Sequence, residues 1–140
     1  MIDTVIVVVF IGNNEVYLKD RSISIFRCED IKVGEGPLFN NVARSLAKSI
    51  FSNITNLYRI NEIIKTLNTE YICYVAVPAI GYMNNILSFL NGKNYGRGYK
   101  RYNIGKILND NSIHSITRGI IEDYLHNNYI SISLESEYYC

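Results

Sequence analysis

The sequence predicts an α+β domain with a mixed sheet, and two patterns in the chain lead to that prediction. Short runs rich in β-branched and aromatic residues, typical of strands, occur along most of the chain. Two longer segments instead place apolar residues at the spacing of an amphipathic helix. The order is three strands, a helix, several strands, a second helix and a tail. Runs of strands interrupted by helices are typical of an α+β sandwich.

The first 28 residues are expected to form three strands. The run TVIVVVFIG, residues 4–12, is rich in β-branched residues and ends at a Gly-Asn-Asn turn, so it predicts a buried strand. Residues 15–21, EVYLKDR, alternate, with Val16 and Leu18 on one face, and are expected to pair back as a hairpin. Residues 22–28, SISIFRC, form a third short strand, and a loop with Gly34, Gly36 and Pro37 follows.

The first helix is predicted directly after this loop and runs to residue 53. Leu46 is expected at the centre of its buried stripe. The apolar residues are Leu38, Val42, Leu46 and Ile50, with Phe39, Ala43 and Ala47 beside them. The opposite face is polar and carries Asn41, Arg44, Ser45, Lys48, Ser49 and Ser52.

Beyond this helix the pattern returns to strands, which are expected at residues 57–67 and 70–79, whereas residues 81–90 are ambiguous. The glycine-rich stretch NGKNYGRGYKRY, residues 91–102, is predicted to be a mobile loop. Residues 101–108 predict a strand that runs into a turn of helix.

The second helix covers residues 111–125, with a polar cap at Asn111 or Ser112 and one apolar face made of Ile113, Ile116, Ile120 and Tyr124. The domain is expected to span residues 1–128. The tail, residues 129–140, alternates in polarity and could add a last strand.

The length and composition of the chain are typical of one domain, and its net charge favours no particular class of binding partner. The chain has 140 residues, 48% of them hydrophobic, with a formal net charge of +1, so a nucleic-acid site would have to be a local patch. The cysteines Cys28, Cys73 and Cys140 are far apart and form no metal-binding motif, which predicts reduced thiols and a cytoplasmic protein without a zinc site. No apolar run is long enough to predict a membrane segment.

The most concentrated positive stretch lies in the predicted loop. Lys93, Arg97, Lys100 and Arg101 could contact phosphates, and Tyr95, Tyr99 and Tyr102 could stack on unpaired bases. This mixture of cations, aromatic rings and glycines predicts a site for RNA or a nucleotide. The alternative is that the segment is only a solvated surface loop.

Residues 34–46, GEGPLFNNVARSL, resemble the GE-x-P-L-x-x-A-x-R-E-L run that is common in Nudix hydrolases. Arg44 matches the arginine of the family motif, and Leu46 matches the apolar residue that follows. The opening hairpin, the strand at 70–79 and the final strand and helix also fall where Nudix domains have such elements. The resemblance implies an α/β/α sandwich with a mixed sheet.

The chain departs from the family pattern at the residues that carry the chemistry. Ser45, Lys48 and Ser49 stand where the motif has glutamates, Phe51 stands in place of its glycine, and Glu35 lies one residue too far from Arg44. Family members use those carboxylates to hold Mg²⁺ or Mn²⁺, and a hard cation needs anionic oxygen ligands. A chain that resembles the family but lacks these carboxylates is therefore expected to be a module with no catalytic residue, metal or cofactor.

Such a module is expected to bind RNA, a ribonucleoprotein such as a ribosomal particle, or a nucleotide, and Arg44 and Lys48 would add a second surface for anions. One alternative is a structural subunit of a protein complex, as in longin-like adaptors, with the tail or the segment YMNNILSFL, residues 82–90, as its contact. Another is a residual nucleotide pyrophosphohydrolase with relocated metal ligands, chosen from Glu15, Glu29, Asp30 and Glu35. His114 and His126 are expected to be surface residues.

Overall fold

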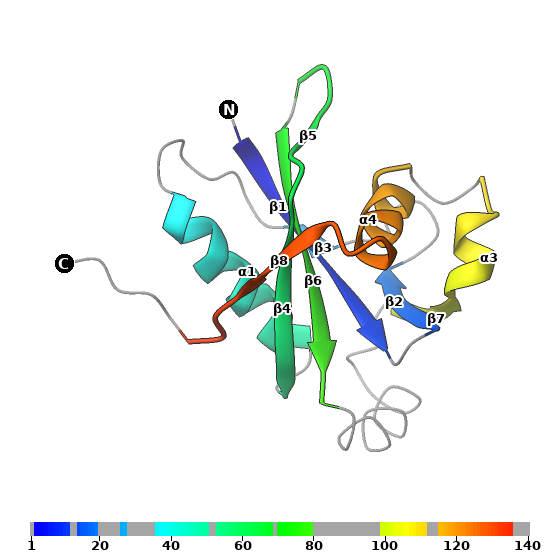
Figure 1. The fold of residues 1–140 in the computed structure, drawn as a ribbon, viewed down its shortest axis with the longest axis horizontal. Coiled ribbons are helices and arrows are strands. Elements are labelled where there is room, and N and C mark those ends of the chain that lie inside the picture. The colour runs from blue at the N-terminus through cyan, green and yellow to red at the C-terminus, as the bar shows by residue number, and fades with distance from the viewer. Residues whose placement is uncertain are drawn as a thin grey trace.

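The fold is a single mixed sheet with helices on both of its faces (Figure 1). The computed structural model describes residues 2–11, 14–19, 26–27, 36–50, 53–68, 70–79, 99–111 and 115–135. The strands are β1 (Ile2–Ile11), β2 (Glu15–Lys19), β3 (Phe26–Arg27), β4 (Ile54–Ile60), β5 (Ile64–Lys65), β6 (Glu70–Pro78), β7 (Tyr99–Asn103) and β8 (Tyr129–Ile132). The helices are α1 (Gly36–Ile50), α3 (Ile104–Leu108) and α4 (Ser115–Leu125).

The main path of the sheet runs β7-β2-β1-β6-β4-β8, with β3 paired to β1 and β5 to β6. β1 and β6 are parallel, with Val7 opposite Tyr74, and the other pairs are antiparallel. The predicted mixed sheet is therefore confirmed. Residues 5–11 of β1 are all at most 2% exposed, because a central strand covered on both faces buries every side chain.

The predicted hairpin is also confirmed. β2 runs antiparallel to β1, with Val9 opposite Tyr17. Val16 and Leu18 belong to the hydrophobic cluster on one face of the sheet, and Tyr17 belongs to the cluster on the other face. Because side chains alternate along β2, this strand contributes residues to both hydrophobic clusters.

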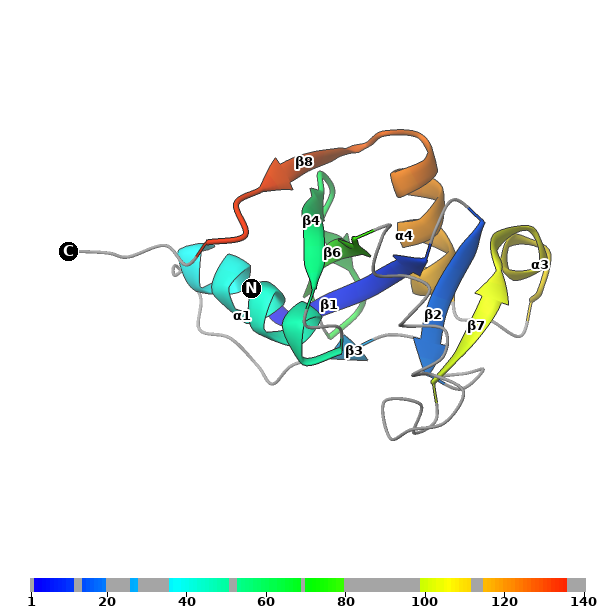
Figure 2. The same cartoon turned by 90° about the horizontal axis from the view of Figure 1, so that it is seen from below.

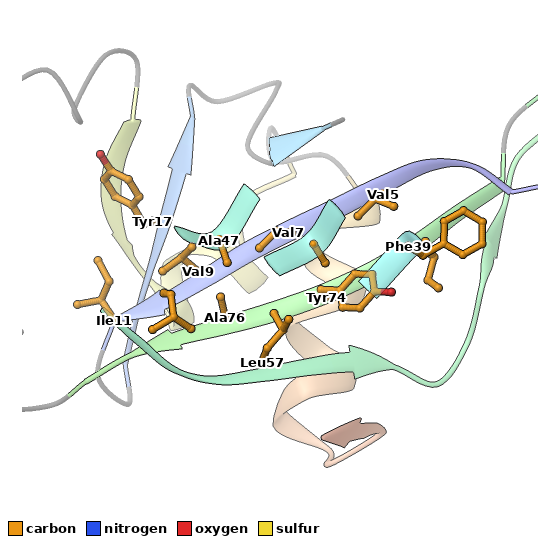
Figure 3. Packing of buried hydrophobic residues seen from close by; sticks show 13 residues of the cluster. Val5, Val7, Val9, Ile11, Tyr17, Phe39, Ala47, Leu57, Tyr74 and Ala76 are labelled. Atoms are coloured by element: carbon orange, nitrogen blue, oxygen red, sulfur yellow. The ribbon is translucent and has the colours of Figure 1, made fainter. Parts of the chain in front are cut away.

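Each face of the sheet has its own hydrophobic cluster and its own helical cover (Figure 2). α1 covers the first cluster, which its residues Phe39, Ala43 and Ala47 share with Val5, Val7 and Val9 of β1. Figure 3 shows this packing, with Phe39 and Ala47 labelled. α3 and α4 cover the second, through Ile104, Ile107, Ile120 and Ile121. The predicted α+β class is confirmed as three layers, helix, sheet and helix.

Helix α1 differs from its prediction in where it begins and in which face it buries. It begins at Gly36, so Pro37 lies in the first turn, where its missing N–H removes no helical hydrogen bond. Among the side chains of α1 that the structure describes, the buried apolar ones are Phe39, Ala43 and Ala47, whereas Leu46 is only partly buried, so the placement of Leu46 at the centre of the stripe was wrong. The small alanine side chains face the sheet and let the helix pack closely on β1.

The predicted mobile loop at 91–102 was wrong for its last four residues, of which residues 101 and 102 also belonged to the predicted strand at 101–108. Tyr99–Asn103 form β7, which pairs with β2 along the length of both strands, while residues 91–98 lie outside the described part of the chain. Because β2 carries backbone groups on both edges, a second neighbour beside β1 satisfies its outer edge. As predicted, this strand runs into a turn of helix, and the Asn103 side chain caps α3 by accepting a hydrogen bond from the Lys106 amide at 3.3 Å.

Helix α4 ends in a Schellman turn that leads directly into β8. Asn127 has a φ of 59°, its amide donates to the Tyr124 carbonyl, and the Asn128 amide donates to the Asp123 carbonyl. The turn reverses the chain, and β8 then pairs with β4, with Ile132 opposite Leu57. The first four residues of the tail therefore belong to the sheet.

Candidate functional site

The Arg44 side chain, predicted to lie on an exposed polar face, is almost fully buried. Its exposed fraction is 3%, and its Nε donates a hydrogen bond of 2.6 Å to the backbone carbonyl of Ser133. One of its terminal nitrogens also donates to the side-chain oxygen of Asn41, one turn earlier in α1. The guanidinium is therefore held between α1 and the residues that follow β8, and not presented on the surface.

Lys48 lies one turn further along α1 and contacts the same segment. Its side chain is exposed, and its Nζ donates to the carbonyl of Leu134 at 3.3 Å. We call residues 133–135 the C-terminal strap. Figure 2 shows the chain leaving β8 and running to α1. The strap links α1 to residues almost ninety positions away, and no local pattern in the sequence indicates such a contact.

The strap is anchored by one apolar side chain between two exposed residues. Leu134 is partly buried against the hydrophobic cluster under α1, whereas Ser133 and Glu135 are exposed. The hydroxyl of Ser133 accepts a hydrogen bond from the Glu135 amide at 3.1 Å. The strap thus crosses the face of α1 that carries Arg44 and Lys48.

The basic segment is only partly described, and its described part is strand β7. Lys100 lies opposite Leu18 and Arg101 opposite Tyr17 in the pairing with β2, and Tyr99 lies opposite Lys19. Lys93, Tyr95 and Arg97 lie outside the described residues. Tyr102 is partly buried against the cluster under α3 and α4, so we expect its ring to pack against this core instead of stacking on a base.

Two surfaces were predicted to bind anions: Arg44 with Lys48 on α1, and the basic segment that includes β7. They lie near opposite ends of the strand order. β7 is the last strand at one end of the main path, whereas the strap follows β8 at the other end. The structure therefore does not bring Arg44 and Lys48 together with Lys100 and Arg101 in one site. Each pair has to be considered as a separate surface.

Comparison with known proteins adds no family to this picture. No protein-family model matches the chain. No curated protein matches it either. The likeness to Nudix hydrolases therefore rests on the motif at 34–46 and on the order of the elements.

The described residues offer no ready metal site. Among them, no group of three or more His, Cys, Asp or Glu side chains is placed to hold a metal ion. Glu15, at the start of β2, is partly buried, while Glu29, Asp30 and Glu35 lie outside the described residues. Ser45, which stands at a motif glutamate, is exposed. None of the helices that the structure describes combines the length and apolar character needed to cross a membrane.

Three tyrosines gather where α4, β4 and β8 meet, and only Tyr124 was predicted from the sequence, as part of the apolar face of the second helix. The ring centroids of Tyr58 and Tyr129 are 4.5 Å apart, those of Tyr124 and Tyr129 are 5.2 Å apart, and Tyr124 also lies 4.3 Å from Phe10. Burial raises the pKa of both Tyr58 and Tyr124 above its usual value, and neighbouring tyrosines add to the effect. Contacts of this kind hold the α4–β8 corner on the sheet.

Two further polar groups lie in the core, the thiol of Cys73 and the hydroxyl of Tyr74, and their surroundings suit a structural role. Cys73 is fully buried in β6, and burial, followed by the charge of Asp123, raises the pKa of its thiol to about 12. Such a thiol is a poor nucleophile because the thiolate is the reactive form. The hydroxyl of the buried Tyr74 donates to the side-chain oxygen of Asn40 at 2.6 Å, which joins α1 to β6.

Proposed function

We propose that this chain is a non-hydrolytic binding module for RNA or a nucleotide, with the β7 edge of the sheet as its contact surface. The observation that carries the proposal is that Tyr99, Lys100 and Arg101 belong to an outermost strand of the described sheet. A strand fixes the backbone of these residues, so less conformational entropy is lost when a ligand binds. Lys93, Tyr95 and Arg97 precede β7 directly in sequence and would extend the same surface.

The residue types suit this ligand class. Arginine and lysine side chains contact phosphates, and tyrosine rings stack on bases that are not paired. The formal net charge of the chain is only +1, so four cations within nine residues make a distinct local patch. A single-stranded segment of RNA would supply both phosphates and exposed base faces.

The α1 side supports a function without hydrolysis. A divalent cation needs several anionic or carbonyl oxygens, yet the helix presents Ser45 and Lys48 at positions of motif glutamates. The two cationic side chains on this face also donate to carbonyls of the C-terminal strap. We therefore expect incubation with Mg²⁺ or Mn²⁺ and a panel of dinucleotide and capped substrates to give no turnover above a buffer blank.

The salt dependence of RNA binding tests the contact surface. Each phosphate contact on a single strand contributes a log–log slope of roughly −0.7, because binding releases condensed counterions. Replacing Lys93, Arg97, Lys100 and Arg101 together by Ser should flatten the slope by about two to three units. A matched pair sharpens the test: Lys100→Ser with Arg101→Ser should flatten the slope, whereas Arg59→Ser with Lys65→Ser removes the same charge on β4 and β5, away from β7, and should not.

Stacking gives a second, independent readout. Replacing Tyr95 and Tyr99 by Ala should weaken binding by about 1–3 kcal/mol per stacked base and leave the slope unchanged. Labelled single-stranded RNA and ADP, titrated in parallel, distinguish an RNA site from a site for a single nucleotide. If neither set of variants alters binding at any ionic strength, the proposal fails and a role as a subunit of a protein complex should replace it.

A further inference from the structure

Strand β8 lies at the end of the described sheet opposite to β7, and its neighbour on the path of the sheet is β4 (Figure 2). The amide of Asn61, directly after β4, donates to the carbonyl of Asn128, directly before β8. Residues that bond to the neighbouring strand alternate along an antiparallel pair, so Ile130 and Ile132 direct their backbone groups to β4. The backbone groups of the residues between them, Tyr129 and Ser131, therefore lie on the outer edge of β8.

The outer edge of β8 has no side chain that would keep another strand away. Edge strands are commonly protected by charged side chains or by proline. Strand β7, at the other end of the sheet, carries Lys100 and Arg101, whereas β8 has the sequence YISI, without charge or proline. The Ile130 side chain is 42% exposed. Within the described part of the chain, no segment other than β4 pairs with β8.

This edge is complementary to a second copy of itself. A twofold axis through the edge makes the two β8 strands antiparallel and keeps equivalent faces of the two sheets on the same side. When the axis passes through Ile130, Tyr129 lies opposite Ser131 of the second copy, so their outward N–H and C=O groups can bond to each other. Ile130 then lies opposite Ile130 of the second copy, at a pair whose Cα atoms are about 4.5 Å apart. No like charges meet in this arrangement.

The residue after β8 disfavours the neighbouring register. An axis through Ser131 would place Tyr129 opposite Ser133 and would require the Ser133 carbonyl as an acceptor. That carbonyl already accepts a hydrogen bond of 2.6 Å from Arg44 Nε, which draws the chain toward α1. A shift by a single residue would bring outward backbone groups opposite groups that are bonded to β4. The register centred on Ile130 is therefore the one that uses only β8 itself.

We propose that β8 is a dimerisation strand, through which two copies of the chain pair antiparallel, with Ile130 at the twofold axis. Each strand has only four residues, whereas stable interfaces bury at least about 1,000 Å². We therefore expect a weak dimer, with a dissociation constant between about 1 μM and 1 mM. Both β7 edges stay free in this dimer, so the inference goes beyond the proposed RNA or nucleotide binding and does not depend on it.

Sedimentation equilibrium of the full chain over this concentration range measures the dissociation constant. Ile130→Lys places two like charges opposite each other at the axis and should weaken the dimer about tenfold. Ser131→Pro removes an outward N–H without removing a bond to β4, and it should also weaken the dimer. Leu67→Lys is the control, because this leucine is 97% exposed in the turn between β5 and β6 and should not affect association.

Disulfide cross-linking tests the register independently. In a chain with Cys28→Ser and Cys140→Ser, Ile130→Cys should form a covalent dimer in oxidised glutathione, because the Cα separation at this pair is within the range of a disulfide. Ser131→Cys should cross-link much less, since residue 131 lies opposite Tyr129 of the second copy. Cys73 is buried and is the same in both chains.

A chain that stays monomeric up to about 1 mM would overturn the proposal. So would a dimer whose dissociation constant is unchanged by both Ile130→Lys and Ser131→Pro, or cross-linking at residue 131 that equals cross-linking at residue 130. Circular dichroism establishes that each variant is folded. If Ser131→Pro is unfolded, Ile130→Lys decides the outcome, because it replaces an exposed side chain whose backbone bonds to β4 remain.

Discussion

At the scale of single residues, Arg44 and Cys73 are ionisable groups that the fold holds away from water in different ways. Arg44 keeps hydrogen-bond partners on Ser133 and Asn41, which offset the loss of its hydration. Cys73 lies among apolar side chains, and its pKa responds to burial and to Asp123. Arg44 is held by specific hydrogen-bond partners, whereas Cys73 stays neutral.

We predict that Cys73 makes stability fall at high pH. Because folding raises the pKa of this thiol from 9.0 to about 12, the folded chain favours the neutral form. The contribution of this thiol to the free energy of unfolding is complete below pH 9 and is lost as the pH rises towards 12. Urea unfolding between pH 8 and pH 11 should show this fall, and Cys73→Ala should reduce it; an equal fall in both chains would contradict the prediction.

Asn127 is a position where backbone conformation alone should decide stability. Its φ of 59° lies in the left-handed region, which glycine enters freely and which is unfavourable for other residues by roughly 1–2 kcal/mol. We expect Asn127→Ala to be less stable than Asn127→Gly by about 1 kcal/mol in chemical denaturation. The pair is its own control, since both variants lose the contact with the Tyr129 hydroxyl. Equal stabilities would show that the Schellman turn is not formed in solution.

At the scale of elements, α1 contributes one face to the core and the other to the strap. Its buried line is Phe39, Ala43 and Ala47, which lies against β1, while Val42 and Leu46 pack at the border. Arg44, directly after the central alanine, points to the strap. The same helix therefore fixes the position of the sheet core and of the C-terminal residues.

Two substitutions in α1 should have different effects for this reason. Ala43→Leu adds volume where the helix meets the sheet and should destabilise the chain by about 1–3 kcal/mol. Leu46→Ala should cost about 1–2 kcal/mol, below the range of about 2–5 kcal/mol for a fully buried leucine. Thermal and urea unfolding measure both effects. A loss for Leu46→Ala well above the loss for Ala43→Leu would show that the helix is rotated relative to the structure.

At the scale of the whole molecule, the chain returns to its first half through β8 and the strap. β8 pairs with β4, and its Ile132, with Leu134 of the strap, packs against the cluster under α1. The α4–β8 corner is joined to the end of β4 by hydrogen bonds between Asn61 and Asn128. The last described residues therefore stabilise elements formed by the first half of the chain.

The C-terminal boundary of the domain follows from this arrangement. A chain that ends at Asn128 loses β8 and the strap, and we expect it to be less stable than a chain that ends at Glu135 by at least about 2 kcal/mol, since partly buried apolar side chains are lost. A chain that ends at Ile132 should lie between the two. Denaturation curves of the three chains measure the order. If the chain ending at Asn128 is as stable as the longest one, β8 contributes nothing to the fold.

The sequence by itself determined the elements whose residues carry a local repeat. The continuous valine run predicts β1, the alternation of Val16 and Leu18 predicts β2, and the helical spacing of Ile116 and Ile120 predicts α4. Each of these patterns shows which residues, close together in the sequence, lie on the same face of a strand or helix. The periodicity is therefore enough to predict the type of element. The order of these elements then indicates the α+β class.

Only the tertiary structure decided how α1 is rotated, where Arg44 lies and where β7 begins. On α1, both the line through Leu46 and the line through Ala43 are apolar at helical spacing, so the sequence could not select the one that faces β1. Arg44 and Lys48 have backbone partners 89 and 86 residues away, and backbone carbonyls carry no signature of residue type. Residues 99 and 100 look like part of the glycine-rich loop by composition, and the predicted strand begins only at residue 101, yet β7 begins at Tyr99 because β2 offers a free edge along its length. Contacts between distant backbone groups depend on the assembled sheet, and local sequence patterns do not encode them.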